Sequence, residues 1–386
     1  MLDHTIDPVQ FRRRLMEWYR ASARELPWRG TKDPYRVWVS EVMLQQTRVA
    51  SVKERYLAFL QRFPTLISLA LAHEADVLAA WSGLGYYQRA RRLHRAARFV
   101  VKELGGVMPA DCFGLRSLPG VGEYTCAAIA SIAYGESVAA VDGNVERVLL
   151  RLTGNSEMSN AAARAFLEAQ AHALMPRARM AQDTNAAGDH NQAMMELGAT
   201  ICLPRGPLCE SCPVISMCKT RGEHVTLPRK ALRSQNAAYL LCLRKKGTAT
   251  EVLLSRRPDE ASLMAGMYEL PPLPETALTG REPLLRARHA ITNTNYYVQV
   301  FTPRNPRDRA LRKSVTAPKE SLEWVLTNTL NFSPLTGMAR KALQRLKVMS
   351  VHDVAVEEAQ AVEEQGAPLE SAKAQQGMES FEEEFG

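Results

Sequence analysis

Four closely spaced cysteines constrain this chain more than any other feature of its sequence. They follow the pattern Cys202-x6-Cys209-x2-Cys212-x5-Cys218, four thiols within seventeen residues. Such a loop can hold a 4Fe–4S cluster or a zinc ion, because thiolates bind both, and the spacing alone leaves the choice open. The chain has seven cysteines in all. An odd number with one tight cluster indicates a metal site in a reducing compartment and argues against a disulfide framework.

The length predicts more than one domain. The chain has 386 residues, whereas a single hydrophobic core stops growing at about 250–300 residues. Up to about residue 200 the pattern is helical, with Asp33-Pro34 as the N-cap and first turn of a helix through Gln46 and a further helix over 89–104. One face of the first helix is apolar, at Phe11, Leu15, Trp18 and Tyr19.

The pattern changes after the cysteines. A polar, basic stretch containing Pro228 precedes strand-like runs over 238–243, 252–254 and 296–301, and a helix over 334–346 follows. We therefore expect a helical domain over 5–220, a linker over 221–234, a small α+β domain over 235–347 and a disordered acidic tail over 348–386. No apolar run approaches the ~18 residues that a membrane span needs, and the N-terminus does not resemble a signal peptide.

The net charge of +8 conceals a strong asymmetry. From Val351 to the end there are ten acids and one base, a net −9, which leaves +17 for residues 1–350. A folded body that basic repels itself unless a polyanion or counterions compensate, and nucleic acid is the leading candidate. A basic surface without a specific partner is the alternative that charge leaves open.

Three further motifs carry candidate chemistry. The run Leu118-Pro119-Gly120-Val121-Gly122 precedes a helix and permits a tight turn whose free amides suit a phosphate, although a plain turn between helices has the same pattern. Glu41 lies in the apolar stretch 37–44, where burial would raise its pKa and make it a general acid, although a solvated helical glutamate would show the same pattern. Asp142 precedes Gly143-Asn144 as an N-cap, and a rigid carboxylate there can also stabilise a sugar cation.

Taken together, these motifs resemble the helix-hairpin-helix DNA glycosylase superfamily and, within it, the MutY adenine DNA glycosylases. The resemblance covers nearly all of residues 6–220 and implies a 4Fe–4S cluster on the four cysteines. The segments that carry it are 26–29 (LPWR), 38–47 (WVSEVMLQQT), 83–87 (GLGYY), 118–122 (LPGVG), 141–145 (VDGNV), 191–198 (NQAMMELG) and the four cysteines.

The resemblance implies removal of adenine mispaired with 8-oxoguanine or guanine in double-stranded DNA. Glu41 would protonate the adenine ring and later activate water. Asp142, oriented by Asn144, would stabilise or capture the sugar cation. Tyr124 stands where the related strand-cleaving enzymes have a lysine, so a monofunctional glycosylase is expected, because a phenol cannot form a Schiff base.

The same resemblance implies the remaining binding residues. Those expected to hold the extrahelical adenine are Trp28, Arg29, Leu44 and Glu196. Those expected to contact DNA near 8-oxoguanine are Gln46, Thr47, Leu84, Tyr86, Gly120, Val121, Gly122 and Thr292. Gln46 and Tyr86 are the candidate wedges in this set, inserted beside the 8-oxoguanine.

The region 235–347 resembles the Nudix-like (MutT-like) module of the family, which helps recognise 8-oxoguanine. The Phe-Ser-His loop of the family aligns with Ile291-Thr292-Asn293, which keeps a hydroxyl but loses the aromatic ring and the imidazole. Recognition through Thr292 is therefore a hypothesis. No glutamate-rich Nudix hydrolase signature is visible, so no nucleotide hydrolysis is expected.

The expected fold is thus an all-α glycosylase core with an iron–sulfur loop, joined to an α+β module. We expect a monomer that binds no membrane and acts in the cytoplasm, on the nucleoid in a bacterium. Three alternatives stay open: a glycosylase for another mismatch such as thymine opposite guanine, a non-catalytic DNA-damage or redox-sensing binder on the same scaffold, and a zinc-stabilised DNA-binding protein.

Overall fold

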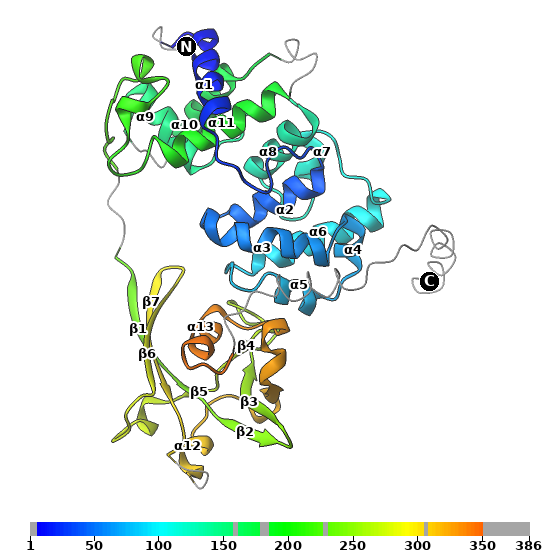
Figure 1. The fold of residues 1–386 in the computed structure, drawn as a ribbon, viewed down its shortest axis with the longest axis vertical. Coiled ribbons are helices and arrows are strands. Elements are labelled where there is room, and N and C mark those ends of the chain that lie inside the picture. Colours follow the sequence, from blue (N-terminus) through cyan, green and yellow to red (C-terminus); the bar gives the residue numbers. More distant parts are fainter. Residues whose placement is uncertain (1–5, 157–160, 178–184, 227–230, 305–307, 350–386) are drawn as a thin grey trace. The chain divides into compact units, whose positions relative to one another are not determined.

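The computed structural model describes residues 6–156, 161–177, 185–226, 231–304 and 308–349. The acidic tail lies outside this range from residue 350 onward. As far as residue 200, the regular elements in the described part of the chain are helices (Figure 1). The first strand begins at residue 233, within the stretch assigned to the linker. No helix in the described part of the chain is both long and apolar enough to cross a membrane.

The helices begin where the sequence supplies caps. Asp7 and Asp33 accept hydrogen bonds from backbone amides in the first turns of α1 and α2, and each is followed by a proline that needs no amide partner. The helices up to the cysteine loop are α1 (Pro8–Ser22), α2 (Pro34–Leu44), α3 (Val49–Arg62), α4 (Leu66–Leu71), α5 (Glu74–Ala80), α6 (Gln88–Leu104), α7 (Cys112–Arg116), α8 (Glu123–Tyr134), α9 (Gly143–Thr153), α10 (Ala161–Leu174) and α11 (Ala186–Thr200).

Three sequence expectations need correction. Helix α2 stops at Leu44 and does not reach Gln46, because Gln46 has a left-handed φ of 55° that no α-helix accommodates. The run 238–243 is two strands, since the chain leaves one sheet after Leu240 and enters the other at Leu243. The last helix begins at Gly337, because the Thr336 side chain caps it.

The second part of the chain forms two four-stranded sheets. One has the order β5-β1-β7-β6, with β1 parallel to β7 and the other pairs antiparallel. In the other, β3 pairs antiparallel with β2, β4 and β8. The elements are β1 (Arg233–Leu240), β2 (Leu243–Lys246), β3 (Ala249–Arg256), β4 (Tyr268–Glu269), β5 (Pro272–Leu273), β6 (Leu285–Ile291), β7 (Thr294–Phe301), α12 (Arg309–Lys313), β8 (Leu322–Leu326) and α13 (Gly337–Arg345).

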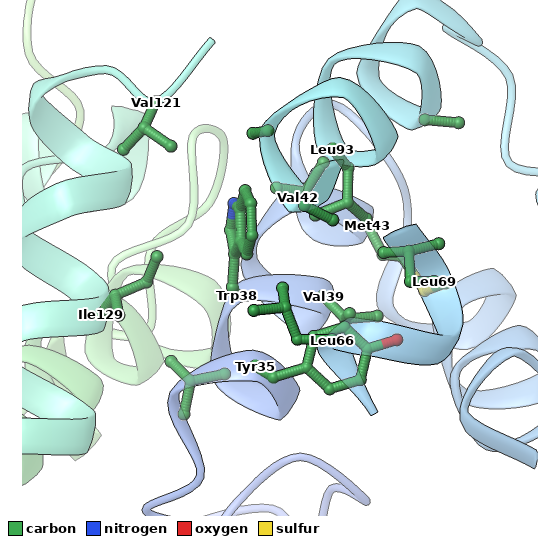
Figure 2. Close-up of a cluster of buried hydrophobic side chains, with 14 of the residues drawn as sticks. Tyr35, Trp38, Val39, Val42, Met43, Leu66, Leu69, Leu93, Val121 and Ile129 are labelled. Atoms are coloured by element: carbon green, nitrogen blue, oxygen red, sulfur yellow. The ribbon is translucent and has the colours of Figure 1, made fainter. Parts of the chain in front are cut away.

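Two apolar cores hold the helical region. The first is built largely from α2, α3, α6 and α8, with Trp38 packed between Val121 and Ile129 on one side and Leu93 on the other (Figure 2). The second is built largely from α1, α9, α10 and α11. Helices α2 and α8 of the first core and α9 and α11 of the second supply the side chains of the site described below.

The cysteine count argued against a disulfide framework, yet the structure contains one disulfide outside the cysteine cluster. Cys112 at the start of α7 and Cys126 on α8 are bonded, with their Cα atoms 4.8 Å apart. The four clustered cysteines and Cys242 are free thiols. The single bond joins the two helices that flank the turn 118–122.

Candidate active site

Glu41 lies on α2 with its side chain only 5% exposed. Its Oε2 accepts a hydrogen bond from the hydroxyl of Tyr124. Burial raises the pKa of Glu41 to about 7, the Tyr124 hydrogen bond opposes the rise, and the negative charge of Asp142 adds to it. A carboxyl with this pKa holds its proton on a large fraction of molecules at neutral pH and can donate it to a base.

Tyr124 occupies the first turn of α8, directly after the turn 118–122. Besides its bond to Glu41, its Oη lies 3.2 Å from the Sδ of Met195 on α11. Burial, followed by the charges of Glu41 and Asp142, raises the pKa of this phenol well above its ordinary value. Tyr124 therefore stays protonated and serves as a hydrogen-bond donor.

Asp142 is the N-cap of α9, as the sequence predicts. Its Oδ1 accepts from the backbone amides of Asn144 at 2.9 Å and Val145 at 2.8 Å, and its Oδ2 accepts from Asn144 Nδ2 at 2.9 Å. Three donors hold the carboxylate in one orientation. A carboxylate fixed in this way can stabilise a positive charge that develops nearby.

Glu41, Tyr124, Asp142 and Asn144 all line one cavity of about 690 Å³. Small-molecule sites usually measure about 300–1,000 Å³. The cavity is also lined by Gly120 and Gly122 of the hairpin and by four residues expected to hold the base. Those four are Trp28, Arg29, Leu44 and Glu196.

Glu196 is 1% exposed and is held by two arginines. Arg24 donates to both carboxylate oxygens, through Nε at 2.7 Å and Nη2 at 2.8 Å, and Arg29 Nη2 donates at 2.5 Å. Burial alone would raise the pKa of Glu196, but the hydrogen bonds from Arg24 and Arg29 lower it overall. Arg24 was not among the residues predicted from the sequence, because no local motif marks it.

The turn 118–122 has a backbone conformation that its glycines permit. Gly120 has a φ of 80°, and a Cβ there would lie 2.9 Å from the Cβ of Arg92. Gly122 is the N-cap of α8 and supplies no side-chain oxygen to its amides. Those amides are therefore available to an anion. The Val121 side chain is buried in the core (Figure 2), so a DNA contact at this residue would have to use its backbone.

A second cavity, of about 620 Å³, is lined by the predicted wedges and by the predicted reader of the oxidised base. These are Gln46, Tyr86 and Thr292, and each has a positive φ, of 55°, 47° and 51°. Non-glycine residues in that region are uncommon and gather at functional sites. Leu84 also lines the second cavity, whereas Thr47 lines the first, and Gln46 lines both. The Thr47 hydroxyl donates to the carbonyl of the buried Leu84 at 3.3 Å.

The four clustered cysteines lie near one another. Burial raises the pKa of the Cys212 thiol to about 11, a bond from the Val214 amide opposes the rise, and the charges of the other three thiols add to it. The Nη1 of Arg151 lies 3.3 Å from the Sγ of Cys202. Among the residues that the structure describes, no group of three or more His, Cys, Asp or Glu side chains is arranged to hold a single metal ion.

Arg147 connects the cysteine loop to the N-terminus of α9. Its Nε donates to the Cys202 carbonyl at 2.8 Å, and its Nη2 donates at 2.8 Å to both the Gly198 carbonyl and the Asn144 Oδ1. Asn144 in turn donates to Asp142. The orientation of the catalytic candidate Asp142 therefore depends on bonds that extend to the loop, and sequence reasoning missed Arg147.

Comparison with known proteins matches residues 39–171 to the model of the HhH-GPD superfamily of base excision DNA repair proteins. The human protein named adenine DNA glycosylase is 38% identical over 318 residues, which are 68% of this chain and 57% of that protein. The adenine DNA glycosylase of Mycolicibacterium smegmatis is 40% identical over 235 residues, which are 61% of this chain and 76% of that protein.

Other relatives are longer than the matched region. A rat adenine DNA glycosylase is 47% identical, and the match covers 55% of this chain and 42% of that protein. The chain thus spans about half the length of the first mammalian relatives it matches. Among solved structures, a thermostable thymine-DNA glycosylase is 31% identical with a TM-score of 0.50, covering 55% of this chain and 96% of the other.

Proposed function

Since this chain belongs to the adenine DNA glycosylase family, of the MutY type, we propose that it hydrolyses the N-glycosidic bond of adenine mispaired with 8-oxoguanine or guanine in DNA. The observation that carries the proposal is the buried, protonatable carboxyl of Glu41 in the same cavity as the fixed carboxylate of Asp142. The two acids have environments that suit opposite roles.

In the proposed reaction the adenine leaves the helix and enters the first cavity. Glu41 donates its proton to the adenine ring, which makes the base a neutral leaving group. The C–N bond then breaks, the sugar becomes positively charged, and Asp142 stabilises that charge or captures the sugar covalently. The ionised Glu41 finally accepts a proton from the attacking water. Glu196, with Arg24 and Arg29, would hold the edge of the base.

The proposed enzyme does not cleave the strand. The residue beside both carboxylates is Tyr124, whose phenol has no amine for a Schiff base with the sugar. Efficient borohydride trapping of a covalent protein–DNA adduct by wild type, lost in a Tyr124→Phe variant, would contradict this proposal.

We further propose that Cys202, Cys209, Cys212 and Cys218 hold a 4Fe–4S cluster. The thiols fit such a group in that all four are free and come from one loop, and the other three add to the raised pKa of the Cys212 thiol, as close neighbours do. When bound, the cluster would brace the loop that Arg147 joins to Asn144. A pure sample with broad absorption near 400 nm supports this proposal, whereas a colourless sample with bound zinc contradicts it.

The region 235–347 is proposed as a Nudix-like module that recognises the base opposite adenine. Support comes from its two sheets with helix α13, and from Thr292, which lines the same cavity as Gln46 and Tyr86. No hydrolysis of nucleotides is proposed for it. Release of diphosphate or monophosphate from 8-oxo-dGTP would contradict that part of the proposal.

Base release from A·8-oxoG, A·G and T·G duplexes tests the proposed function. The thymine-DNA glycosylase among the structural relatives makes T·G the informative alternative. We expect adenine release from the first two duplexes and no thymine release, because only a purine needs protonation by Glu41. Thymine release without adenine release would overturn the assignment. Normal DNA binding without release of any base would indicate a binding protein.

A further inference from the structure

We infer that Arg89 is a positioning residue that fixes both wedge candidates, Gln46 and Tyr86, through a single buried guanidinium. The inference rests on the proposed function, because it assigns a role within extrusion of the adenine. Arg89 lies in the first turn of α6 and is 9% exposed. In the described structure no carboxylate pairs with the Arg89 guanidinium. Its partners are carbonyl oxygens, a hydroxyl and aromatic rings instead.

Each terminal nitrogen of Arg89 serves a different set of acceptors. Nη1 donates to the carbonyls of Val42 at 2.8 Å and Met43 at 2.9 Å, and also to that of Gln45. These carbonyls lie at the C-terminal end of α2, where helical amide partners run out. Arg89 thus terminates α2 immediately before Gln46.

Nη2 of Arg89 serves the loop that carries the other wedge. It donates to the carbonyls of Leu84 and Gly85, both at 3.1 Å, and to the hydroxyl of Thr47 at 2.9 Å. The guanidinium also lies over the ring of Tyr86, 5.6 Å from its centroid. The same side chain therefore holds the residues directly before Gln46 and directly before Tyr86.

The backbone conformation of the two wedge candidates explains why a buried side chain must hold them in place. Both have left-handed backbones, at φ 55° and 47°, and both side chains are exposed, Tyr86 by 50%. Strained residues persist only where their surroundings determine the backbone. A planar guanidinium reaches both segments at once, whereas a lysine ammonium is a single point and cannot.

Arg89→Lys tests the inference, because it keeps the charge and most of the stem. Arg95→Lys is the matched control: it lies on the same helix, is exposed and lines neither cavity. With enzyme in excess, Arg89→Lys should slow adenine release from an A·8-oxoG duplex by about 10²-fold, the usual cost of a displacement near 1 Å. Arg95→Lys should match wild type.

Two readouts separate positioning from a general structural role. Adenine opposite an abasic-site analogue is already unpaired and costs least to extrude, so Arg89→Lys should lose much less there. In a background that already carries Gln46→Ala and Tyr86→Ala, Arg89→Lys should add little, since coupled residues are not additive. The pH dependence of release should stay that of wild type, because Glu41 is untouched.

Thr47→Val provides a second test that keeps Arg89 and removes only the hydroxyl shared between the two segments. It should show the same substrate pattern with a smaller loss, at an unchanged melting temperature. An equal loss on paired and unpaired adenine, or full additivity with the wedge substitutions, would overturn the inference. A wild type that releases no adenine from either substrate would instead overturn the proposed function and this inference with it.

Discussion

Surroundings determine what each acidic side chain of the first cavity can do. Burial raises the pKa of Glu41 to about 7, and the hydrogen bond from Tyr124 only partly opposes this rise. Glu196 is just as buried, but Arg24 and Arg29 lower its pKa and keep it ionised. Asp142 is fixed by three donors from its own helix start. Three carboxyl groups of similar chemistry thus lie in three different environments, which suit the different roles proposed for them.

The raised pKa of Glu41 has a consequence for stability. A carboxyl whose folded pKa exceeds its unfolded value stabilises the fold fully below the unfolded pKa, and that stabilisation is lost as the pH rises through about 7. We therefore expect Glu41→Gln to become more stable relative to wild type between pH 5 and pH 8. Melting temperatures measured across this range, with the exposed Glu54→Gln as control, check the prediction. A difference that does not change with pH would contradict it.

Local sequence signals explain which of these residues could be predicted. Asp142 precedes Gly-Asn at a helix start, and Glu41 lies in an apolar helical run, so their neighbours marked both as candidates, and the resemblance supplied their predicted roles. Arg24 was not, because its partner Glu196 lies 172 residues away along the chain and only the packing of α1 against α11 brings them together. The roles of Glu41 and Asp142 stay predictions until they are measured.

At the scale of elements, the site depends on contacts between helices that no single helix specifies. Arg147 on α9 bonds to the C-terminal end of α11 and to the cysteine loop, and it holds Asn144 beside Asp142. The sequence predicts α9 and its cap, yet not this connection. The end of α2 was likewise misplaced, because its last carbonyls accept hydrogen bonds from Arg89, which belongs to α6.

Loss of the Arg147 connection should weaken catalysis more than it weakens folding. Arg147→Met removes the donor to Asn144 while keeping an apolar stem, so we expect adenine release to fall by about 10–10²-fold, as for a misoriented catalytic group. Single-turnover rates together with melting temperatures check this, with the exposed Arg95→Met as control. A rate within twofold of wild type would show that Asn144 and Asp142 keep their geometry without Arg147.

Substitution of Gly188 tests how closely α11 approaches α8. A Cβ on Gly188 would lie 2.8 Å from both the Cα of Ile132 and the carbonyl oxygen of Ser131, which are backbone atoms. Gly188→Ala should therefore destabilise the fold by about 1–3 kcal/mol, as overpacking does. Gly143→Ala meets no atom within 4 Å and should leave stability nearly unchanged. Equal unfolding free energies for the two variants in denaturant titrations would contradict this.

For the whole molecule, the residue pattern predicted a helical region, and the resemblance of its ordered motifs to MutY-type enzymes predicted a glycosylase core, which the matched family confirms. The α+β character of the second part also followed from its strand-like runs. The sheet order, with β1 beside β7 along their full length, did not, because parallel pairing joins residues far apart in the chain. The net charge of +17 over residues 1–350 fits a body that binds DNA.

In the proposed mechanism Glu41 supplies the proton and Asp142 stabilises the positive charge on the sugar. Single-turnover adenine release from an A·8-oxoG duplex tests it most directly, for wild type, Glu41→Gln, Asp142→Asn and the exposed control Glu54→Gln. We expect losses of at least about 10²-fold for the first two variants, since each removes one catalytic role, and none for the control. Release at the wild-type rate by either Glu41→Gln or Asp142→Asn would contradict this mechanism.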